Sequence, residues 1–369
     1  MGNHGATAQC GYDYRRGSGD GDALSSAGVM ANANIGQLTV EAYMRACLSA
    51  HPRSYYRRKD TGLGRDFTTA PEISQMFGEL LAVWFIDAYQ QMGQQAESVR
   101  AFIELGVGRG SMAKDMARVF AKHPTFNQAM TYHSVDINDH VDTGGKHHRQ
   151  ASTLPRCGWF VVANEFFDSL PTRQFIYHRG AWRERMVIAN DKGLSFALGT
   201  EVATLPSGLD EDDVQEAREQ MCLEYTPELD VWGALLAKQL CRYGGRALII
   251  DYGYQAPSSG DSLRAIRRGQ FCHPLTHVGD ADLSVAVNFA QLAACARRHG
   301  CYVFQQEQGA FLRQLGIEAR AQRLIKDNPH KQAAIDMACY RLTSTAQMGS
   351  MFKVMCLSPD KTIPTGFAK

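Results

Sequence analysis

The sequence lacks an excess of charge of either sign and lacks closely paired cysteines. Lys and Arg total 39 against 38 Asp and Glu, which excludes a globally basic surface for nucleic acid, although local basic patches remain open. The 10 cysteines include no C-x-x-C pair, the spacing typical of structural zinc sites. They are typical instead of scattered thiols in a reducing compartment. We therefore expect no metal site and no nucleic-acid partner.

Long apolar runs are also missing from the chain. No stretch reaches the roughly 18 apolar residues needed to span a bilayer, so we expect an intracellular protein without a membrane span. Residues 1–36 are rich in glycine and poor in large apolar side chains. Such a segment buries too little surface to offset the entropy lost on ordering. We expect a disordered N-terminal tail there.

Hydrophobic residues make up 44% of the 369 residues, which is enough for a sizeable core. Short apolar segments alternate with amphipathic segments, a pattern that favours an α/β fold with a mostly parallel sheet. The expected strands are 101–105, 132–136, 159–163, 246–251, 302–306 and 351–357. The expected helices are 38–50, one that opens at Thr69 with the capping-box pattern Thr69-Ala-Pro-Glu72, 111–123, 229–243 and 289–299.

The pattern changes after Pro171. Short strand-like segments are separated there by turn residues at Arg179-Gly180 and at 190–193, which predicts an antiparallel meander inserted after a sheet strand. The expected organisation follows from this change. It comprises an N-terminal helical segment at 37–95, a core at 96–170 and 229–358, an inserted β-rich and helical subdomain at 171–228, and a C-terminal tail at 359–369.

A glycine-rich motif, Glu104-Leu-Gly106-Val-Gly108-Arg-Gly110, follows an expected strand and opens an expected helix. Glycine allows a tight turn and a close approach of a ligand to the main chain. A dinucleotide fingerprint would place its third glycine where this chain has Ser111. The motif resembles motif I of class I S-adenosyl-L-methionine-dependent methyltransferases, and that resemblance implies that Glu104 and the three glycines bind this cofactor. An ordinary glycine-rich turn is the structural alternative.

Acidic and amide side chains follow two other strands. Asp136 ends the second strand, where an acid in nucleotide-binding α/β folds accepts hydrogen bonds from ribose hydroxyls; a helix cap is the alternative. Asn164, Glu165 and Asp168 follow a very apolar strand, and ligands in open α/β sheets bind at that end. Polar groups there are costly without partners. We expect a clamp for cofactor or substrate, with Asn164 assigned to the cofactor; a loop that satisfies its own polar groups is the alternative.

Several longer runs resemble the MidA-like family of methyltransferases, whose mitochondrial members assist complex I assembly. The resemblance covers about residues 40–358 and is carried by Asp66-Phe-Thr-Thr-Ala-Pro-Glu-Ile-Ser74, Asn164-Glu-Phe-Phe-Asp168, Trp182-Arg-Glu-Arg185, Asp251-Tyr-Gly253 and Gly279-Asp-Ala-Asp282-Leu283. The chain departs from the family pattern at Arg65, at Asn288 and in a short stretch from Asn138 to Arg149. These departures concern the detailed shape of the pockets.

The resemblance implies a class I methyltransferase fold: a Rossmann-like, doubly wound and mostly parallel sheet whose late strand is antiparallel, with an N-terminal helical segment and a β-meander insertion. It implies methylation of arginine in a protein client such as a complex I core subunit. Carboxylates orient a guanidinium well, so the candidate catalytic residues are Glu165, Asp168 and Asp66, with Glu72 next. The expected location is the cytoplasm of a bacterium or the mitochondrial matrix.

Two other classes of function stay open. The first is an RNA or small-molecule methyltransferase, and the near-neutral charge weighs against the RNA version. The second is a non-catalytic assembly or binding factor that retains the fold; the intact glycines and the Asn164 to Asp168 run weigh against it. The sequence leaves the oligomeric state open, with a homodimer as one option.

Overall fold

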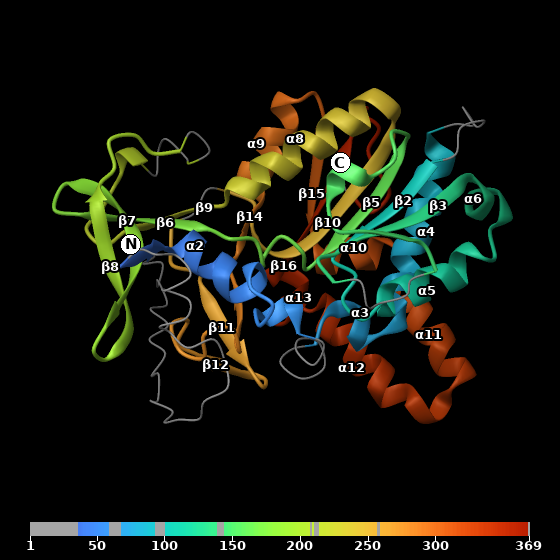
Figure 1. Ribbon diagram of the computed structural model, residues 1–369. Helices are drawn as coiled ribbons and strands as arrows, with labels where there is room; N and C mark the ends of the chain where they lie inside the picture. Colours follow the sequence, from blue (N-terminus) through green and yellow to red (C-terminus); the bar gives the residue numbers. More distant parts are fainter. Residues whose placement is uncertain are drawn as a thin grey trace, which may run out of the picture.

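The computed structural model describes residues 36–58, 68–92, 100–138, 144–206, 209, 214–256 and 259–367. An eight-stranded sheet forms the centre of the protein, in the order β15-β16-β10-β5-β2-β3-β4 with β14 paired to β10 (Figure 1). Its strands are β2 (Arg100–Leu105), β3 (Met130–Val135), β4 (Lys146–His148), β5 (Trp159–Asn164), β10 (Gly245–Tyr254), β14 (Val287–Asn288), β15 (Tyr302–Glu307) and β16 (Phe352–Ser358).

The strands of this sheet are parallel except at one side. β16 pairs antiparallel with both β10 and β15, whereas β10, β5, β2, β3 and β4 pair parallel with their neighbours. The predicted fold class is therefore confirmed, including the antiparallel late strand. The chain runs outward from β2 to β3 and β4 and then returns to β5, on the other side of β2. Such a reversal opens a crevice beyond the carboxyl ends of the strands.

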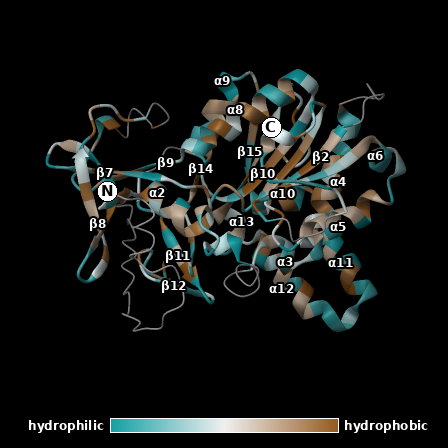
Figure 2. Ribbon diagram, in the orientation of Figure 1, coloured by the Kyte–Doolittle hydropathy of each residue, from teal (hydrophilic) through white to brown (hydrophobic). Residues whose placement is uncertain are grey.

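Helices cover both faces of the sheet, and all six residues of β2 and of β5 are buried as a result. Figure 2 shows these central strands as hydrophobic. One face packs against α4 (Gln75–Gln91), α5 (Ser111–Phe120), α10 (Gln308–Gln314), α11 (Ile317–Asp327) and α12 (Gln332–Thr343). The other face packs against α8 (Pro227–Tyr243) and α9 (Phe289–Arg298). Shorter helices are α3 (Ala70–Ile73), α6 (Pro124–Ala129) and α13 (Met348–Met351).

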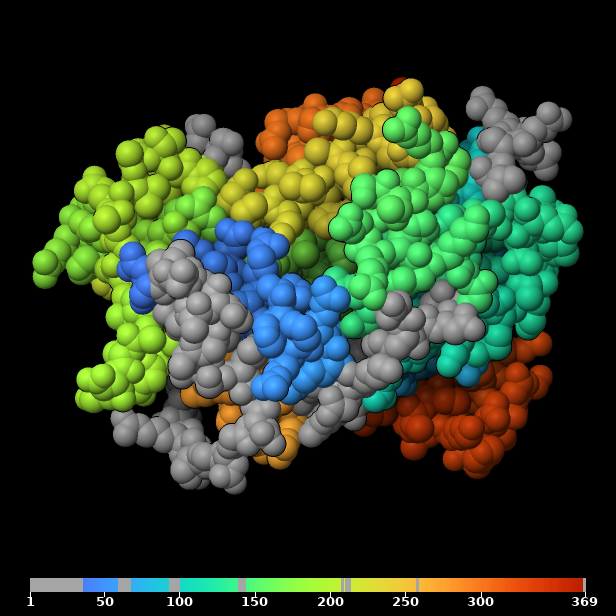
Figure 3. Space-filling view, viewed as in Figure 1, coloured from blue at the N-terminus to red at the C-terminus, as the bar shows by residue number. Residues whose placement is uncertain are grey.

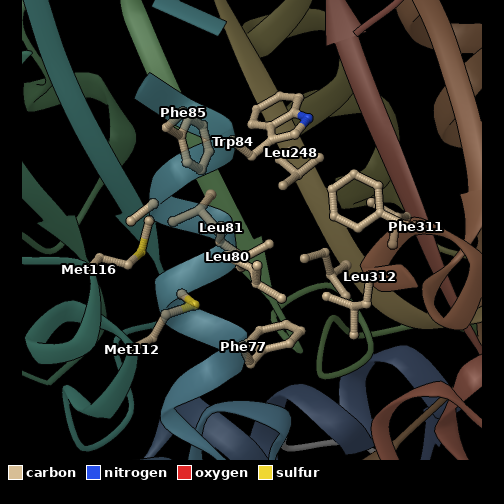
Figure 4. Close-up of a cluster of buried hydrophobic side chains, with 14 of the residues drawn as sticks. Phe77, Leu80, Leu81, Trp84, Phe85, Met112, Met116, Leu248, Phe311 and Leu312 are labelled. Atoms are coloured by element: carbon tan, nitrogen blue, oxygen red, sulfur yellow. The ribbon is translucent and has the colours of Figure 1, made fainter. Parts of the chain in front are cut away.

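Aromatic and aliphatic side chains fill the first of these interfaces (Figure 4). Phe77, Leu80, Leu81, Trp84 and Phe85 point from α4 into it, and Met112, Met116, Leu248, Phe311 and Leu312 meet them from α5, β10 and α10. Fully burying one such side chain contributes on the order of 1.5–3 kcal/mol. This packing fixes α4 and α5 against the sheet and thereby fixes the loop that enters α5.

Two smaller antiparallel sheets lie beside the central one (Figure 1). The predicted meander forms β6 (Arg173–His178), β7 (Ala181–Asn190), β8 (Gly193–Glu201) and β9 (Cys222–Tyr225), and β1 (Gln37–Thr39) joins it by pairing with β7. The third sheet contains β11 (Arg264–Arg267), β12 (Gln270–Cys272) and β13 (Asp282–Ser284).

The N-terminal segment packs between these sheets. It contains α2 (Val40–Arg45), the π-helical turn η1 (Ala46–Ala50) and the 3-10 turn η2 (Tyr55–Arg57). Buried Tyr43, Met44 and Cys47 contact Val187 of β7 and the third sheet within one apolar cluster. In Figure 3 the N-terminal segment, in blue, lies between the meander, in yellow-green, and the residues that come just before the meander in the chain, in green.

The structure differs from the sequence prediction in three places. The helix expected to open at Thr69 is two helices, because Ser74 is extended (φ −161°, ψ 138°) and its hydroxyl caps α4 by accepting from Met76 N at 3.2 Å. Thr69 makes no side-chain capping bond. The helix expected at 38–50 begins only at Val40, because Gln37–Thr39 form β1, and its second half is the π-helical turn Ala46–Ala50. Helices α10 to α12 between β15 and β16 were not predicted.

No helix among the residues described combines the length and apolarity that a bilayer crossing requires.

Candidate functional site

A cavity of about 400 Å³ opens at the carboxyl ends of β2, β3 and β5. Seven of the predicted site residues line it: Glu72, Glu104, Gly106, Gly108, Asp136, Asn164 and Glu165. Gly110 and Asp168 do not line it, and Asp66 and Arg65 fall outside the described residues. We call residues 104–110 with Asp136 the glycine-loop wall, and Glu72, Asn164 and Glu165 the acidic wall.

The glycine-loop wall is shaped by its backbone. Gly106, Gly108 and Gly110 have φ values of 72°, 55° and 74°, a region that favours glycine. A Cβ added at Gly106 would lie 3.0 Å from Cδ2 of Phe166. Gly110 is the residue before α5. The loop therefore turns from β2 into α5 with its main chain bare toward the cavity.

Asp136 holds this loop in place. Its Oδ2 accepts from Val107 N at 3.1 Å and its Oδ1 from Asn138 N at 2.9 Å. Each carboxylate oxygen can accept a second hydrogen bond, so Asp136 retains acceptor capacity toward the cavity that it lines.

Glu104 is a buried carboxyl group at the end of β2, 1% exposed. The Tyr132 hydroxyl donates a hydrogen bond to its Oε2. Burial raises the pKa of Glu104 to about 7, against the opposing effect of the Tyr132 bond. The group can thus change its charge near neutral pH when a ligand enters.

Asn164 and Glu165 form a connected pair on the acidic wall. Asn164 Nδ2 donates to Glu165 Oε1 at 3.2 Å, and the same oxygen accepts from Ala70 N, at the start of α3, at 3.2 Å. Asn164 Oδ1 is buried and has no partner among the described residues. A buried acceptor left unpaired costs about 1–3 kcal/mol. A hydrogen-bond donor on a ligand would remove this cost.

Glu165 also carries backbone strain and an altered pKa. Its φ is 50°, in the left-handed region that non-glycine residues seldom occupy, and such outliers cluster at functional sites. Burial raises the pKa of Glu165 to about 8, with a further contribution from the charge of Asp168. A carboxyl group in this condition is stabilised by a cation.

Asp168 lies behind the acidic wall and is positioned by Asp251. The fully buried Asp251 carboxylate accepts from Phe167 N at 3.0 Å and from Asp168 N at 3.2 Å through Oδ2, and from Tyr252 N at 3.0 Å through Oδ1. Burial raises the pKa of Asp168 to about 7. Asp168 does not line the cavity, and its charge contributes to the raised pKa of Glu165.

Several cavity residues were missed by the sequence analysis. Arg45 of α2 contacts Glu228 of α8 at 2.8 Å, and both line the cavity. Arg109 of the glycine loop lies 3.7 Å from Glu72, whose other oxygen is buried without a partner among the described residues. Glu228 stands in the first turn of α8, where acids are common for helix stability alone. Its sequence position therefore gave no signal.

The arrangement can hold a ligand with hydroxyl groups against the glycine-loop wall and a cation against the acidic wall. The first wall offers bare backbone and the Asp136 carboxylate. The second offers the Glu165 carboxyl group, whose pKa burial raises to about 8, and acceptor oxygens of Glu72 and Asn164 that are unpaired among the described residues. A ligand with neutral groups alone would leave the Glu165 carboxyl group of the acidic wall without a charged partner among the described residues.

Comparisons with known proteins identify the family and the fold. Residues 80–306 match the family described as "Putative S-adenosyl-L-methionine-dependent methyltransferase". The chain is 31% identical, over 88% of its length and 82% of the relative, to the protein named protein arginine methyltransferase NDUFAF7 homolog, mitochondrial, of Drosophila melanogaster. It is 29% identical to protein arginine methyltransferase NDUFAF7, mitochondrial, of Xenopus laevis, over 89% of this chain and 83% of that one.

A solved structure has the same fold. A Burkholderia thailandensis protein, bound to S-adenosyl-homocysteine in its crystal, matches with a TM-score of 0.75 and 23% identity, over 92% of each chain.

Proposed function

Because the chain belongs to the family of S-adenosyl-L-methionine-dependent methyltransferases, we propose that it methylates an arginine side chain of a protein. The observation that carries the choice of arginine is the acidic wall. There, Glu72 and Asn164 each keep a buried oxygen without a partner among the described residues, beside the strained Glu165. A guanidinium offers five N–H donors in one plane and a permanent positive charge.

The glycine-loop wall fits S-adenosyl-L-methionine. At Gly106, an added Cβ would lie 3.0 Å from Phe166, so the loop has room for the main chain but not for a side chain. We assign Glu104, Gly106, Gly108 and Asp136 to cofactor binding, with Asp136 accepting from the ribose hydroxyls. Gly110 supports the loop from the start of α5. When bound, the cofactor supplies an electrophilic methyl group from its sulfonium.

The chain's own residues orient the acceptor. Glu165 Oε1 is held by Ala70 N and Asn164 Nδ2, so its Oε2 is left to accept from the substrate guanidinium. Fixing the nucleophile in line with the methyl group is the main contribution that a protein makes to such a displacement. Because the pKa of Glu165 is about 8, Oε2 can also take the proton that the guanidinium releases. Asp168 keeps that pKa high, and Asp66 stays a prediction from the sequence.

The client and the location are proposed from the family resemblance. The relatives are named protein arginine methyltransferases and mitochondrial. A complex I core subunit is the client that we propose, in the mitochondrial matrix if the chain comes from a eukaryote. Cytoplasmic location in a bacterium stays a prediction, and so does the homodimer.

The test is the identity of the methylated product. The full-length protein is incubated with radiolabelled S-adenosyl-L-methionine and separate protein, RNA and small-molecule fractions of a cell extract. The labelled fraction is hydrolysed and its amino acids are separated. We expect labelled methylarginine in the protein fraction. Label in RNA or small molecules, or labelled methyllysine alone, would contradict the proposal.

A variant pair links the product to the acidic wall. Glu165→Gln removes the charge and the proton acceptor, and we expect methylarginine formation to fall by about 100-fold or more, as with lost transition-state contacts elsewhere. Glu201→Gln removes an exposed carboxylate on β8 and should leave the activity unchanged. Equal activity of the two variants would contradict the role given to Glu165.

A further inference from the structure

We infer that Asn164 binds the methyl-accepting side chain and makes the site selective for a guanidinium over an ammonium group. The inference rests on the proposed arginine methylation and names a residue that recognises the acceptor. The sequence had placed Asn164 with the cofactor residues; its hydrogen bond instead joins it to Glu165 and, through Glu165, to the start of α3.

Asn164 is almost fully buried, at 7% exposure, and ends β5. Its Cα is paired in register with Ile250 of β10, so the strand fixes where the side chain starts. Nδ2 donates to Glu165 Oε1 at 3.2 Å. Oδ1 is buried in the cavity lining and accepts no hydrogen bond in the described part of the chain. Buried amide oxygens are nearly always paired, so this atom is arranged for a donor that arrives with a ligand.

The hydrogen bonds assign that atom to the acidic wall. Asn164 bonds to Glu165, and Glu165 bonds in turn to Ala70 N of α3. On the glycine-loop wall, Asp136 bonds to the amides of Val107 and Asn138. Among the residues described, no hydrogen bond joins Asn164 to that second network. Asn164 and Glu165 thus form one unit, and the cofactor's contacts are built separately.

This unit places two acceptor oxygens at the lining of the cavity, the buried Asn164 Oδ1 and Glu165 Oε2. The bond between Nδ2 and Oε1 holds the amide beside the carboxylate. A guanidinium has parallel N–H groups in a rigid plane and can donate to both at once. An ammonium is a compact charge whose donors diverge, and it can satisfy one oxygen well and the other poorly. The pair therefore favours arginine.

The test compares Asn164→Ala, Asn164→Asp and a control, Asn190→Ala, in the full-length protein. Asn190 lies in the exposed turn between β7 and β8. S-adenosyl-homocysteine affinity is measured by titration calorimetry. The kcat and KM are measured with a peptide that contains one arginine, and with the same peptide carrying lysine in its place.

We expect Asn164→Ala to keep its S-adenosyl-homocysteine affinity while kcat/KM for the arginine peptide falls by about 100-fold, since a site's polar groups are left unpaired. Its preference for arginine over lysine should fall by about tenfold. Asn164→Asp keeps an acceptor oxygen at the same place and should recover part of the arginine activity. Should the alanine variant fail to fold, the Asp variant carries the test, with reduced arginine preference and unchanged affinity as the expected result.

Two results would overturn the inference. Loss of S-adenosyl-homocysteine affinity in Asn164→Ala would make Asn164 a cofactor residue. Unchanged kcat/KM and unchanged arginine preference would leave it without a role in recognising the acceptor. Failure of the proposed function is seen separately, because the wild-type protein would then form no methylarginine before any variant is compared.

Discussion

The two walls of the cavity differ in how complete they are without a ligand. On the glycine-loop wall, the backbone supplies the shape, and both oxygens of Asp136 already accept main-chain amides. On the acidic wall, side chains supply the shape. Asn164 and Glu72 keep unpaired buried oxygens among the described residues, and Glu165 combines a φ of 50° with a pKa of about 8.

The glycine-loop wall is thus a surface whose hydrogen bonds are already made, whereas the acidic wall, in the described part of the chain, lacks a positively charged partner for its unpaired oxygens. The Asp136 bonds of the glycine-loop wall lie wholly within the protein. On the acidic wall, Arg109 approaches Glu72 at 3.7 Å, but Glu72 Oε2 and Asn164 Oδ1 stay unpaired among the described residues. Such unpaired buried oxygens are the usual cost of a site that binds a charged group in a partly buried place. Binding of the positively charged acceptor would therefore remove this cost and contribute to its affinity.

The largest effect is expected from breaking the glycine-loop wall. Gly106→Val forces a branched side chain into a position with φ of 72° and within 3.0 Å of Phe166. We expect calorimetric affinity for S-adenosyl-homocysteine to fall by about 100-fold or more, because the side chain fills the space that the cofactor approaches. The matched control is Gly180→Val, at φ 79° in the turn between β6 and β7 with no atom within 4 Å of its Cβ.

Both variants place valine in the same unfavourable backbone region, so the control accounts for backbone strain and leaves the crowding at Phe166 and the cavity as the difference. Gly180→Val should lower the melting temperature and leave the affinity unchanged. If Gly106→Val bound S-adenosyl-homocysteine as tightly as the control, the loop would not be the cofactor site.

The glycine-loop wall could be predicted because its parts are close in sequence. The apolar strand, the glycines and the helix all lie between Arg100 and Phe120, and each has a local pattern. Asp136 follows the next strand along the chain, and parallel strands place their carboxyl ends at one edge of the sheet. The roles of these residues toward a ligand are still predictions, although their placement follows from the pattern.

The acidic wall could be predicted only in part. Asn164 and Glu165 were found from their place after a buried strand. Their partner Ala70 bonds to Glu165 across 95 residues of sequence. Elsewhere in the cavity lining, Arg45 contacts Glu228 across 183 residues. No periodicity encodes such contacts, because they arise when α3 and the N-terminal segment pack against the sheet. The split at Ser74 was missed for a related reason, since a serine cap inside an apolar helical pattern gives a weak signal.

A smaller effect should appear in the pH dependence of the acidic wall. Binding a guanidinium favours ionised Glu165, whose pKa is about 8 in the free protein. Below that pH the carboxyl group must lose a proton before it can pair. We therefore expect kcat/KM for an arginine peptide to rise by about 25-fold from pH 6.5 to 8.5, in proportion to the ionised fraction of Glu165, and then level off.

Variants identify the group that titrates. Glu165→Gln should have low activity without this rise. Asp168, with a pKa of about 7, also titrates in the window, and Asp168→Asn should keep a rise whose midpoint moves to lower pH as the nearby charge is removed. A profile that is unchanged in Glu165→Gln would show that another group controls the pH dependence.

The smallest expected effect concerns the stability of the folded protein. It tests the difference between the two walls in the absence of any ligand. The pKa of Glu165 is raised from 4.5 to about 8 in the folded protein. The unfolded chain therefore releases this proton first, and the folded state loses stability as the pH rises from about 4.5 to about 8. Glutamine has no proton to release, so the advantage of Glu165→Gln over the wild type should grow across that window.

We expect Glu165→Gln to melt about 2–4 °C above the wild type at pH 8.5 and close to it at pH 5, measured without cofactor or peptide. Glu201→Gln, which removes an exposed carboxylate, should track the wild type at both pH values. A variant that loses arginine methylation while gaining stability at high pH would show that Glu165 is retained for the acceptor and opposes folding. Equal melting at pH 8.5 would instead mean that the free protein already satisfies this carboxylate, and the contrast between the two walls would not hold.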